Sequence, residues 1–168
     1  MSYILRNQDI VSGKPGKVQM EEHMIAIGCD HGGLQLKNEI IKHLEAQNIE
    51  CQDFGTFSEE AVDYPVYGRL VAKAVADGVC DRGILICGTG IGISITANKV
   101  KGIRAALCGD CFSAQATREH NDANILALGA RVTGTGLALK IVDTFLKTPF
   151  SNDERHINRI RQIEEEDM

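Results

Sequence analysis

The sequence predicts an α/β fold in which helices cover both faces of a parallel sheet. Short apolar runs alternate five times with longer amphipathic segments, and glycine-containing or polar loops separate them. Strands and helices that alternate in this way are joined by right-handed crossovers into a parallel sheet. The chain has 168 residues, of which 43% are hydrophobic, and this is the size and composition of one domain with its own core.

We expect this single domain to occupy residues 24–168. Residues 1–23 show no sustained period and contain the polar run GKPGK at 13–17, so we exclude them from the fold. They are either a natural extension or a segment added by cloning, and the sequence does not separate the two.

Composition excludes several classes of protein. No apolar run approaches the ~20 residues of a membrane span, and the start of the chain lacks the apolar core of a secretory signal. Six cysteines in 168 residues are too few for a disulfide scaffold, which favours a reducing cytoplasm. A net charge of −5 argues against general nucleic-acid binding, so we expect a small-molecule partner.

The first two strand–helix units follow from the hydrophobic pattern. Residues 24–29 (MIAIGC) predict a strand, and the segment 34–47 predicts a helix with apolar residues at helical spacing: Leu36, Ile40, Ile41 and Leu44. Residues 49–54 predict the second strand. The motif DYP at 63–65 then marks the start of a helix over 66–77, whose inward residues are expected to be Leu70, Val71, Ala74 and Val75.

The third unit, residues 82–99 (RGILICGTGIGISITANK), is the stretch around which the chain is organised. Residues 83–87 have no polar interruption, as a buried parallel strand requires. Gly88, Gly90 and Gly92 then let backbone N–H groups approach an anion. Cys87 stands where the strand meets this loop, and the start of the next helix favours its thiolate.

These residues also have simpler interpretations. Cysteine is often a small core residue. The spacing G-x-G-x-G matches neither the dinucleotide fingerprint nor the P-loop, so the loop indicates a phosphate or an oxyanion and implies neither NAD nor ATP.

Five further segments complete the pattern. Residues 102–108 predict the fourth strand, and 113–119 a short helix that ends at His120-Asn121-Asp122. Residues 125–128 predict the fifth strand, and a charged helix begins at residue 153. Between them, 134–147 predicts a helix with five inward residues: Leu137, Ile141, Val142, Phe145 and Leu146.

Residues that directly follow strands gather at one edge of a parallel sheet, where such folds bind ligands. Four loops contribute here: Asp30 and His31; Cys87 to Gly90; Gly109, Asp110 and Cys111; and Gly129, Ala130 and Arg131. His120 and Asn121 belong to a helix end instead. Asp30 alone would also suit a helix N-cap, and His120 alone would suit a helix C-terminus, where it meets the dipole.

Two other pairs have open alternatives. Arg155 and Arg159 are four apart on one helix face, which suits either a two-pronged hold on phosphate or a solvated face paired with nearby carboxylates. Cys108 and Cys111 form C-x-x-C, but no second pair at metal spacing accompanies them. We therefore expect no metal site.

Five motifs together make the sequence similar to the ribose-5-phosphate isomerase B family, which includes galactose-6-phosphate and allose-6-phosphate isomerases. They are IAIGCDHGG (25–33), DYP (63–65), GILICGTGIGISITANK (83–99), REHNDANILALGAR (118–131) and ERHINR (154–159). The resemblance implies a five-stranded, Rossmann-like sheet in a homodimer, often paired into tetramers, with active sites shared between subunits. It also implies aldose–ketose isomerisation of phosphorylated sugars in the pentose phosphate pathway, without a metal or nucleotide cofactor.

The same resemblance implies a role for each matching residue. Cys87 would be the base that moves a proton between C2 and C1 through an enediolate. Backbone N–H groups of Gly88, Gly90 and Gly92 would stabilise the enediolate oxygen, and Thr89 would relay protons between hydroxyls. Some family members have serine at the cysteine position and a glutamate later in the loop. Here Cys87 is present and Ser94 and Ile95 follow, so the cysteine version is indicated.

The remaining roles concern ring opening and binding. His120, assisted by Asp30, would open the sugar ring by acid–base exchange. Asn121 would hold a hydroxyl or the enediolate, and Tyr64 would line the pocket. Four residues, some of them from the second subunit, would receive the phosphate: His31, Arg131, Arg155 and Arg159.

The preferred interpretation is a ribose-5-phosphate isomerase, and the alternative is a six-carbon sugar-phosphate isomerase with the same catalytic set. A non-catalytic sugar-phosphate or nucleotide-binding module would need the phosphate ligands but not Cys87, His120 or Asp30. A redox role for Cys108 and Cys111 is a third hypothesis, which thiol titration with and without reductant would test.

Overall fold

The protein folds around one sheet of five parallel strands in the order β2-β1-β3-β5-β4. The computed structural model describes residues 24–165, so the expectation for residues 1–23 lies outside it. The strands are β1 (Ile25–Cys29), β2 (Cys51–Asp53), β3 (Arg82–Cys87), β4 (Ala105–Leu107) and β5 (Ile125–Gly129). The predicted α/β fold with a five-stranded parallel sheet is confirmed.

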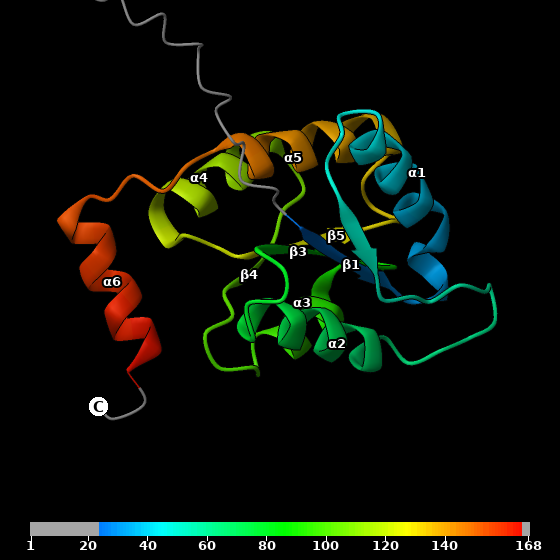
Figure 1. Ribbon diagram of the computed structural model, residues 1–168, viewed down its shortest axis with the longest axis horizontal. Helices are drawn as coiled ribbons and strands as arrows, with labels where there is room; N and C mark the ends of the chain where they lie inside the picture. The colour runs from blue at the N-terminus through cyan, green and yellow to red at the C-terminus, as the bar shows by residue number, and fades with distance from the viewer. Residues whose placement is uncertain (1–23, 166–168) are drawn as a thin grey trace, which may run out of the picture.

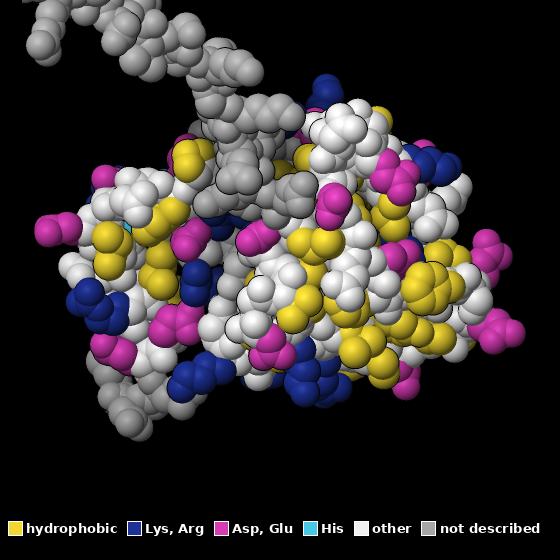
Figure 2. All heavy atoms as spheres, in the orientation of Figure 1, with side chains coloured by type: hydrophobic (Ala, Val, Ile, Leu, Met, Phe, Trp, Pro, Cys, Tyr) yellow, Lys and Arg dark blue, Asp and Glu magenta, His cyan; other side chains and the backbone are white. Residues whose placement is uncertain are grey.

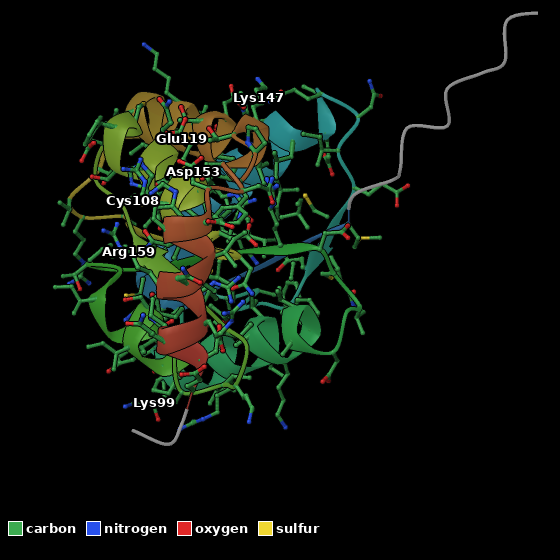
Figure 3. All side chains as sticks on the ribbon, turned by 90° about the vertical axis from the view of Figure 1, so that its left-hand side faces the viewer. Lys99, Cys108, Glu119, Lys147, Asp153 and Arg159 are labelled. Atoms are coloured by element: carbon green, nitrogen blue, oxygen red, sulfur yellow. The ribbon has the colours of Figure 1, made fainter. Side chains whose placement is uncertain are left out.

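Helices cover both faces of this sheet (Figure 1). One face carries α1 (Leu34–Glu45), α4 (Cys111–Asn121) and α5 (Thr135–Lys147), and the other carries α2 (Tyr64–Ala76) and α3 (Ile91–Ala97). The last helix, α6 (Glu154–Glu164), lies beyond the β4 edge and packs beside α4 (Figures 1 and 3). A single 3₁₀ turn, η1 (His31–Gly33), joins β1 to α1. None of these helices is long and apolar enough to cross a bilayer.

The central strand β3 explains why the apolar run at 83–87 has no alternation. Ile84 and Ile86 pack into the core layer under α1 and α5, whereas Leu85 and Cys87 pack into the layer over α2 and α3. Each fully buried isoleucine or leucine contributes about 1.5–3 kcal/mol relative to an exposed side chain. Burial on both faces therefore makes β3 the central strand of the sheet, and Cys87 lies at its carboxyl end.

Several predicted boundaries differ from those in the structure, and two of the differences have a clear local cause. The fourth strand begins at Ala105 and not at residue 102, because Gly102 lies in a turn with φ of +78°. The helix predicted over 113–119 spans Cys111–Asn121, because the Asp110 carboxylate accepts a hydrogen bond from the Ser113 N–H at 2.8 Å and starts the helix earlier.

Two residues predicted to point inward are instead 43% exposed: Leu70 and Leu137. On α2 the buried stripe runs through Val71, Ala74 and Val75, and Leu70 lies beside this stripe, near the exposed Val66. Leu137 is in the first turn of α5, one position before the buried stripe begins at Ala138.

Candidate active site

Cys87 ends β3 at the carboxyl edge of the sheet, where the residue is 4% exposed. The loop after it turns back so that the N–H of Gly90 donates to Cys87 Sγ at 3.1 Å. Gly90 has a φ of +76°, and a Cβ there would lie 2.5 Å from Cδ1 of Leu107. Only glycine fits this turn, and the turn directs an N–H dipole that stabilises negative charge on the sulfur.

Asp30 and His31 reach the same edge because β1 is the neighbour of β3. The Asp30 N–H donates to the carbonyl of Ile86 at 3.2 Å, and the Asp30 Oδ1 accepts from the Gly33 N–H at 3.1 Å. The carboxylate therefore caps the 3₁₀ turn, as the simpler interpretation of Asp30 expected, and it does so beside the strand that ends in Cys87.

The tautomer of neutral His31 is set by a backbone contact. Its Nδ1 accepts a hydrogen bond from the Val62 N–H at 3.2 Å. A neutral imidazole that accepts at Nδ1 carries its proton on Nε2. The loop before α2 thus leaves His31 with Nε2–H as its donor group.

Arg131 joins this group from the end of β5. Its N–H donates to the carbonyl of Gly88 at 3.0 Å, and the Ala130 N–H donates to the carbonyl of Cys87 at 2.9 Å. A Cβ on Gly32 would lie 3.7 Å from Arg131 Nη2 and 3.6 Å from the nitrogen of Gly88. The guanidinium therefore lies between the loops that follow β1 and β3.

Tyr64 and Thr89 complete this first group. A Cβ on Gly92 would lie 2.5 Å from Cζ of Tyr64, so the tyrosine ring packs directly on the glycine. Thr89 is exposed, and its Oγ1 accepts from the Ile91 N–H at 3.3 Å. The residues at the carboxyl edge of the sheet are called the first group below. They are Asp30, His31, Tyr64, Cys87 to Gly92 and Arg131.

His120 and Asn121 lie at the opposite edge. They end α4, which runs back to the start of β5, and the Arg104 Nε donates to the carbonyl of Asn121 at 2.8 Å just before β4 begins. Ile125 pairs with Gly83, whereas Gly129 pairs with Cys87. The four residue steps between Ile125 and Gly129 span about 13 Å at roughly 3.3 Å per residue. Within one chain, the structure does not bring His120 and Asn121 to Cys87.

Helix α6 adds Arg155 and Arg159 to these residues. The Ser151 N–H donates to the Glu119 carbonyl at 3.2 Å, which ties the start of α6 to the last turn of α4. Arg155 Nη2 lies 3.5 Å from Asp153 Oδ2, with 68% of its side chain exposed, as the solvated-face interpretation expected for one of the two arginines. Figure 3 shows Asp153 just before this helix and Arg159 on it, in front of the β4 edge.

The second group is the set of residues at the amino edge: His120, Asn121, Arg155, His156 and Arg159. Sequence reasoning missed His156, which is 3% exposed and lies with its ring centroid 4.5 Å from that of His120. Burial lowers the pKa of His156 below its ordinary value, and the charges of His120, Arg155 and Arg159 add to this effect. The motif ERHINR contains the residue but gives no sign of a contact with α4.

Comparison with known proteins identifies the family of this chain. The Ribose/Galactose Isomerase family matches residues 25–163. The chain belongs to this family. Ribose-5-phosphate isomerase B of Escherichia coli K12 is 53% identical over 139 residues, which cover 83% of this chain and 93% of that protein. The galactose-6-phosphate isomerase subunit LacB of Clostridium acetobutylicum is 41% identical over 142 residues, 84% of this chain and 82% of that subunit.

Solved structures agree with the sequence comparison. The structure of ribose-5-phosphate isomerase B of Clostridium thermocellum superimposes on this chain with a TM-score of 0.83 at 58% identity. The match covers 84% of this chain and 95% of that chain. The protein from Thermotoga maritima named as a ribose 5-phosphate isomerase gives a TM-score of 0.83 at 49% identity, with 84% and 97% covered. The resemblance seen in the motifs is confirmed, and the protein is an isomerase of this family.

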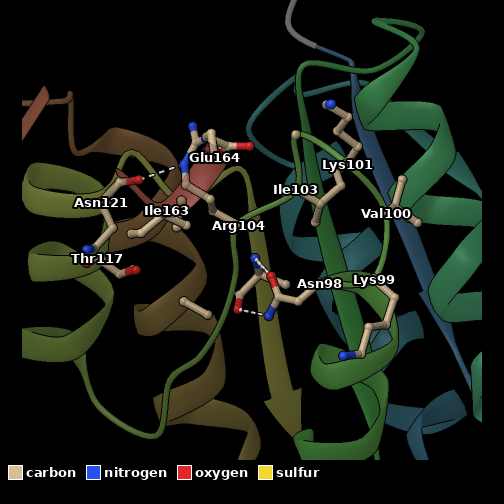
Figure 4. Close-up of a pocket in the computed structure, with 14 residues that line it drawn as sticks. Asn98, Lys99, Val100, Lys101, Ile103, Arg104, Thr117, Asn121, Ile163 and Glu164 are labelled. Atoms are coloured by element: carbon tan, nitrogen blue, oxygen red, sulfur yellow. Dashed lines mark hydrogen bonds and ion pairs between the residues drawn. The ribbon is translucent and has the colours of Figure 1, made fainter. Parts of the chain in front are cut away.

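A cavity of about 550 Å³ adjoins the second group of this isomerase. It lies among the loop before β4, the end of α4 and the end of α6, and Figure 4 shows Arg104 bonded to Asn121 at its wall. Lys99 and Lys101 of the loop also line it. Of the residues in the two groups, only Asn121 lines this cavity.

Burial favours the protonated form of four other thiols in this isomerase. Burial raises the pKa of Cys29 to about 12 and of Cys51 and Cys108 to about 11, and it also raises the pKa of Cys80. These thiols stay protonated at neutral pH, which weakens the redox hypothesis at Cys108, one of the two cysteines that it needs. Across residues 24–165, no three His, Cys, Asp or Glu side chains are grouped so that they could hold a metal ion.

Proposed function

We propose that this isomerase interconverts ribose 5-phosphate and ribulose 5-phosphate through an enediolate, with Cys87 as the base. The observation that carries the proposal is the position of the Cys87 sulfur, which lies at the end of β3 with the Gly90 N–H directed at it. Asp30 and Arg131 flank the same loop. The relatives named as ribose-5-phosphate isomerases, 53% and 58% identical, favour a five-carbon substrate.

The proposed reaction neither gains nor loses a proton overall. The Cys87 thiolate removes the proton from C2 of the open-chain aldose, and the C1 carbonyl becomes an enediolate oxygen. The thiol then returns a proton to C1, while the Thr89 hydroxyl relays the proton of the C2 hydroxyl to the oxygen on C1. The thiolate is regenerated, so the reaction consumes no reductant, oxidant or cofactor.

The loop divides its N–H groups between sulfur and oxygen in this proposal. The Gly90 N–H serves the thiolate, because it is already directed at Sγ. The developing enediolate oxygen is then left to the other N–H groups of the loop from Gly88 to Gly92. Charge stabilisation of this kind is usually a large catalytic term, on the order of 3 kcal/mol for one donor.

We place ring opening and part of the phosphate site on a second subunit of a homodimer. In the first group, Arg131 and the Nε2–H of His31 would bind the phosphate. His120 would open the ring, assisted by Asp30 across the interface, Asn121 would hold a hydroxyl, and Arg155 and Arg159 would bind the phosphate from the partner. The separation of the two groups within one chain supports this arrangement, because neither group alone carries the full set of roles.

Exposed apolar surface supports an assembly of this kind. On α6, Ile157 and Ile163 are 38% and 60% exposed. On α2, Val66 and Leu70 are 54% and 43% exposed. Figure 2 shows hydrophobic side chains gathered over the part of the surface where this helix lies. A dimer would bury one of these surfaces, and a pair of dimers would bury a second. The cytoplasmic location and the tetramer stay predictions.

A six-carbon sugar phosphate is the second candidate substrate, because the LacB subunit is 41% identical over most of its length. A coupled assay with ribose 5-phosphate, allose 6-phosphate and galactose 6-phosphate separates the two. We expect kcat/KM to be highest for ribose 5-phosphate. A higher kcat/KM for either six-carbon sugar would replace the first candidate, and no turnover of any of the three would refute the proposed activity.

A further inference from the structure

His156 packs against the histidine that the proposed mechanism uses for ring opening. The centroids of the two rings lie 4.5 Å apart, and the ring planes are tilted by 41°. His156 is 3% exposed, whereas His120 is exposed. The buried ring of His156 therefore packs behind the exposed ring of His120, and of the two only His120 is accessible to a substrate.

Hydrogen bonds fix His156 in this position. Its Nδ1 shares a hydrogen bond of 2.7 Å with Ser151 Oγ, which also accepts from the Asp153 N–H at 3.2 Å. The Ser151 N–H donates to the carbonyl of Glu119, the residue before His120. The ring of His156 cannot turn away from His120 without breaking its hydrogen bond to Ser151, the residue that ties α6 to α4.

The charges around His156 favour its neutral form. Burial is the largest cause of its lowered pKa, followed by the positive charges of His120 on α4 and of Arg155 and Arg159 on α6. Asp153 acts in the opposite sense from 3.9 Å. A neutral ring beside His120 leaves that residue free to take and release a proton without a second positive charge at van der Waals distance.

We propose that His156 is a positioning residue whose ring holds the imidazole of His120 in the orientation that opens the sugar ring. The inference rests on the proposed function of His120. His156 acts through His120 and leaves the proton transfer by Cys87 untouched, because its ring is 3% exposed and packs behind His120, away from the substrate. Its loss therefore slows only the reaction of a cyclic substrate.

Ribulose 5-phosphate makes the test specific. Its C5 hydroxyl is phosphorylated, so this ketose has no five-membered ring to open. Exchange of its C1 hydrogen with deuterium from the solvent needs the base and the enediolate only. Conversion of ribose 5-phosphate, which is mostly cyclic, needs ring opening as well.

Three variants separate the roles. His156→Ala removes the ring, His156→Phe keeps a ring without its nitrogens, and Asn158→Ala is a control at an exposed position of the same helix. We expect His156→Ala to lower kcat for ribose 5-phosphate at least tenfold and to leave C1 exchange in ribulose 5-phosphate within twofold of the parent. His156→Phe should keep at least a third of the parent kcat, and Asn158→Ala should match the parent.

Several results would overturn the inference. In His156→Ala, an unchanged kcat would show that the ring has no role, and an equal loss of kcat and of C1 exchange would show a general structural role. A kcat for His156→Phe as low as that of His156→Ala would rule out ring support. Circular dichroism checks that each variant is folded.

A second measurement needs no sugar. At 4.5 Å, the His156 ring shifts the Hε1 resonance of His120 in the proton NMR spectrum through its ring current. The resonance is assigned by its loss in His120→Asn. We expect His156→Ala to abolish the shift and His156→Phe to retain one, and an unmoved resonance in His156→Ala would refute the contact. If the parent enzyme does not exchange the C1 hydrogen of ribulose 5-phosphate, the proposed function fails, and the NMR experiment still decides whether His156 holds His120.

Discussion

The backbone N–H of Gly90 donates to the sulfur of Cys87 at 3.1 Å, across a loop that only glycine can form. This contact links the most distinctive motif of the sequence to a chemical property, because an N–H dipole stabilises a thiolate more than a thiol. Burial raises the thiol pKa of Cys29 to about 12 and of Cys51 and Cys108 to about 11.

Replacing the base is the first test of the mechanism. Cys87→Ala should lower kcat by about three orders of magnitude, because alanine cannot take the C2 proton. The fold should survive, since only one sulfur atom is lost from a core layer. Cys111→Ala is the matched control, a cysteine at the start of α4 outside both groups, and it should keep the parent kcat. Activity of Cys87→Ala within tenfold of the parent would remove the cysteine base.

A second prediction concerns stability at alkaline pH. Burial raises the pKa of Cys108 to about 11 from a value of 9.0 in the unfolded chain. Unfolding therefore releases a proton between these two pH values, so the stability contributed by the neutral thiol is complete below pH 9 and is lost as pH rises towards 11. The free energy by which the parent exceeds Cys108→Ala should shrink by about 1–2 kcal/mol between pH 8 and pH 11. Urea unfolding measures it, and a constant difference would contradict the shift.

A third prediction concerns a buried ion pair to which sequence analysis gave no role. Lys37 Nζ lies 2.8 and 2.7 Å from the two oxygens of Asp53 and 2.7 Å from the carbonyl of Thr56. The lysine side chain is 1% exposed and the aspartate side chain 27%. Removing the aspartate leaves a buried ammonium, whereas removing the lysine leaves a carboxylate that reaches water.

The two single variants should therefore differ in the free energy of unfolding. Asp53→Ala should cost about 3–5 kcal/mol, as for a broken buried pair, and Lys37→Met should cost less. Urea unfolding of both variants and of the double variant measures the difference. Equal costs, or a larger cost for Lys37→Met, would mean that the buried charge does not decide stability here.

The sequence was most informative where burial decides the structure. The apolar run at 83–87 fits β3 because this strand is buried on both faces. The parallel pairing of β1, β3 and β5 then brings Asp30, Cys87 and Arg131 to one edge. Boundaries failed where a local contact decides them, as at the Asp110 cap. The exposure of Leu70 could not be read from periodicity, because the period does not show how wide the buried stripe of a helix is.

The second group was harder to predict for a physical reason. Residues after strands share an edge by topology, but residues that end helices lie at the opposite edge, so His120 could not be placed beside Cys87 from spacing. The contact between His120 and His156 joins residues far apart in the chain through the packing of α6 on α4. No local sequence pattern indicates such a contact.

The arginines of α6 give the fourth prediction. Arg155→Ala and Arg159→Ala should each raise KM about tenfold to a hundredfold with a smaller change in kcat, because each removes a charge-assisted bond to phosphate of about 1.5–3 kcal/mol. Arg161→Ala is the control, an exposed arginine on the same helix. An unchanged KM for both Arg155→Ala and Arg159→Ala would leave the solvated-face interpretation in place.

The last prediction tests whether one active site uses two chains. Cys87 belongs to the first group, and His120 belongs to the second group at the opposite edge of the sheet. If each site combines the first group of one subunit with the second group of its partner, a mixed dimer of Cys87→Ala and His120→Asn has one site with both defects and one with neither. Two inactive proteins should then regain activity once their subunits exchange.

The expected recovery can be calculated and controlled. At random exchange about half of the dimers are mixed, so about a quarter of all sites should be intact, as two-fold symmetry requires. Cys87→Ala mixed with the Arg155→Ala/Arg159→Ala double variant should recover to the same extent. Cys87→Ala mixed with Arg131→Ala is the control, because both changes lie in the first group and no mixed dimer has an intact site. If native mass spectrometry shows exchange and no pair regains activity, His120 serves the cysteine of its own chain or does not take part in the reaction.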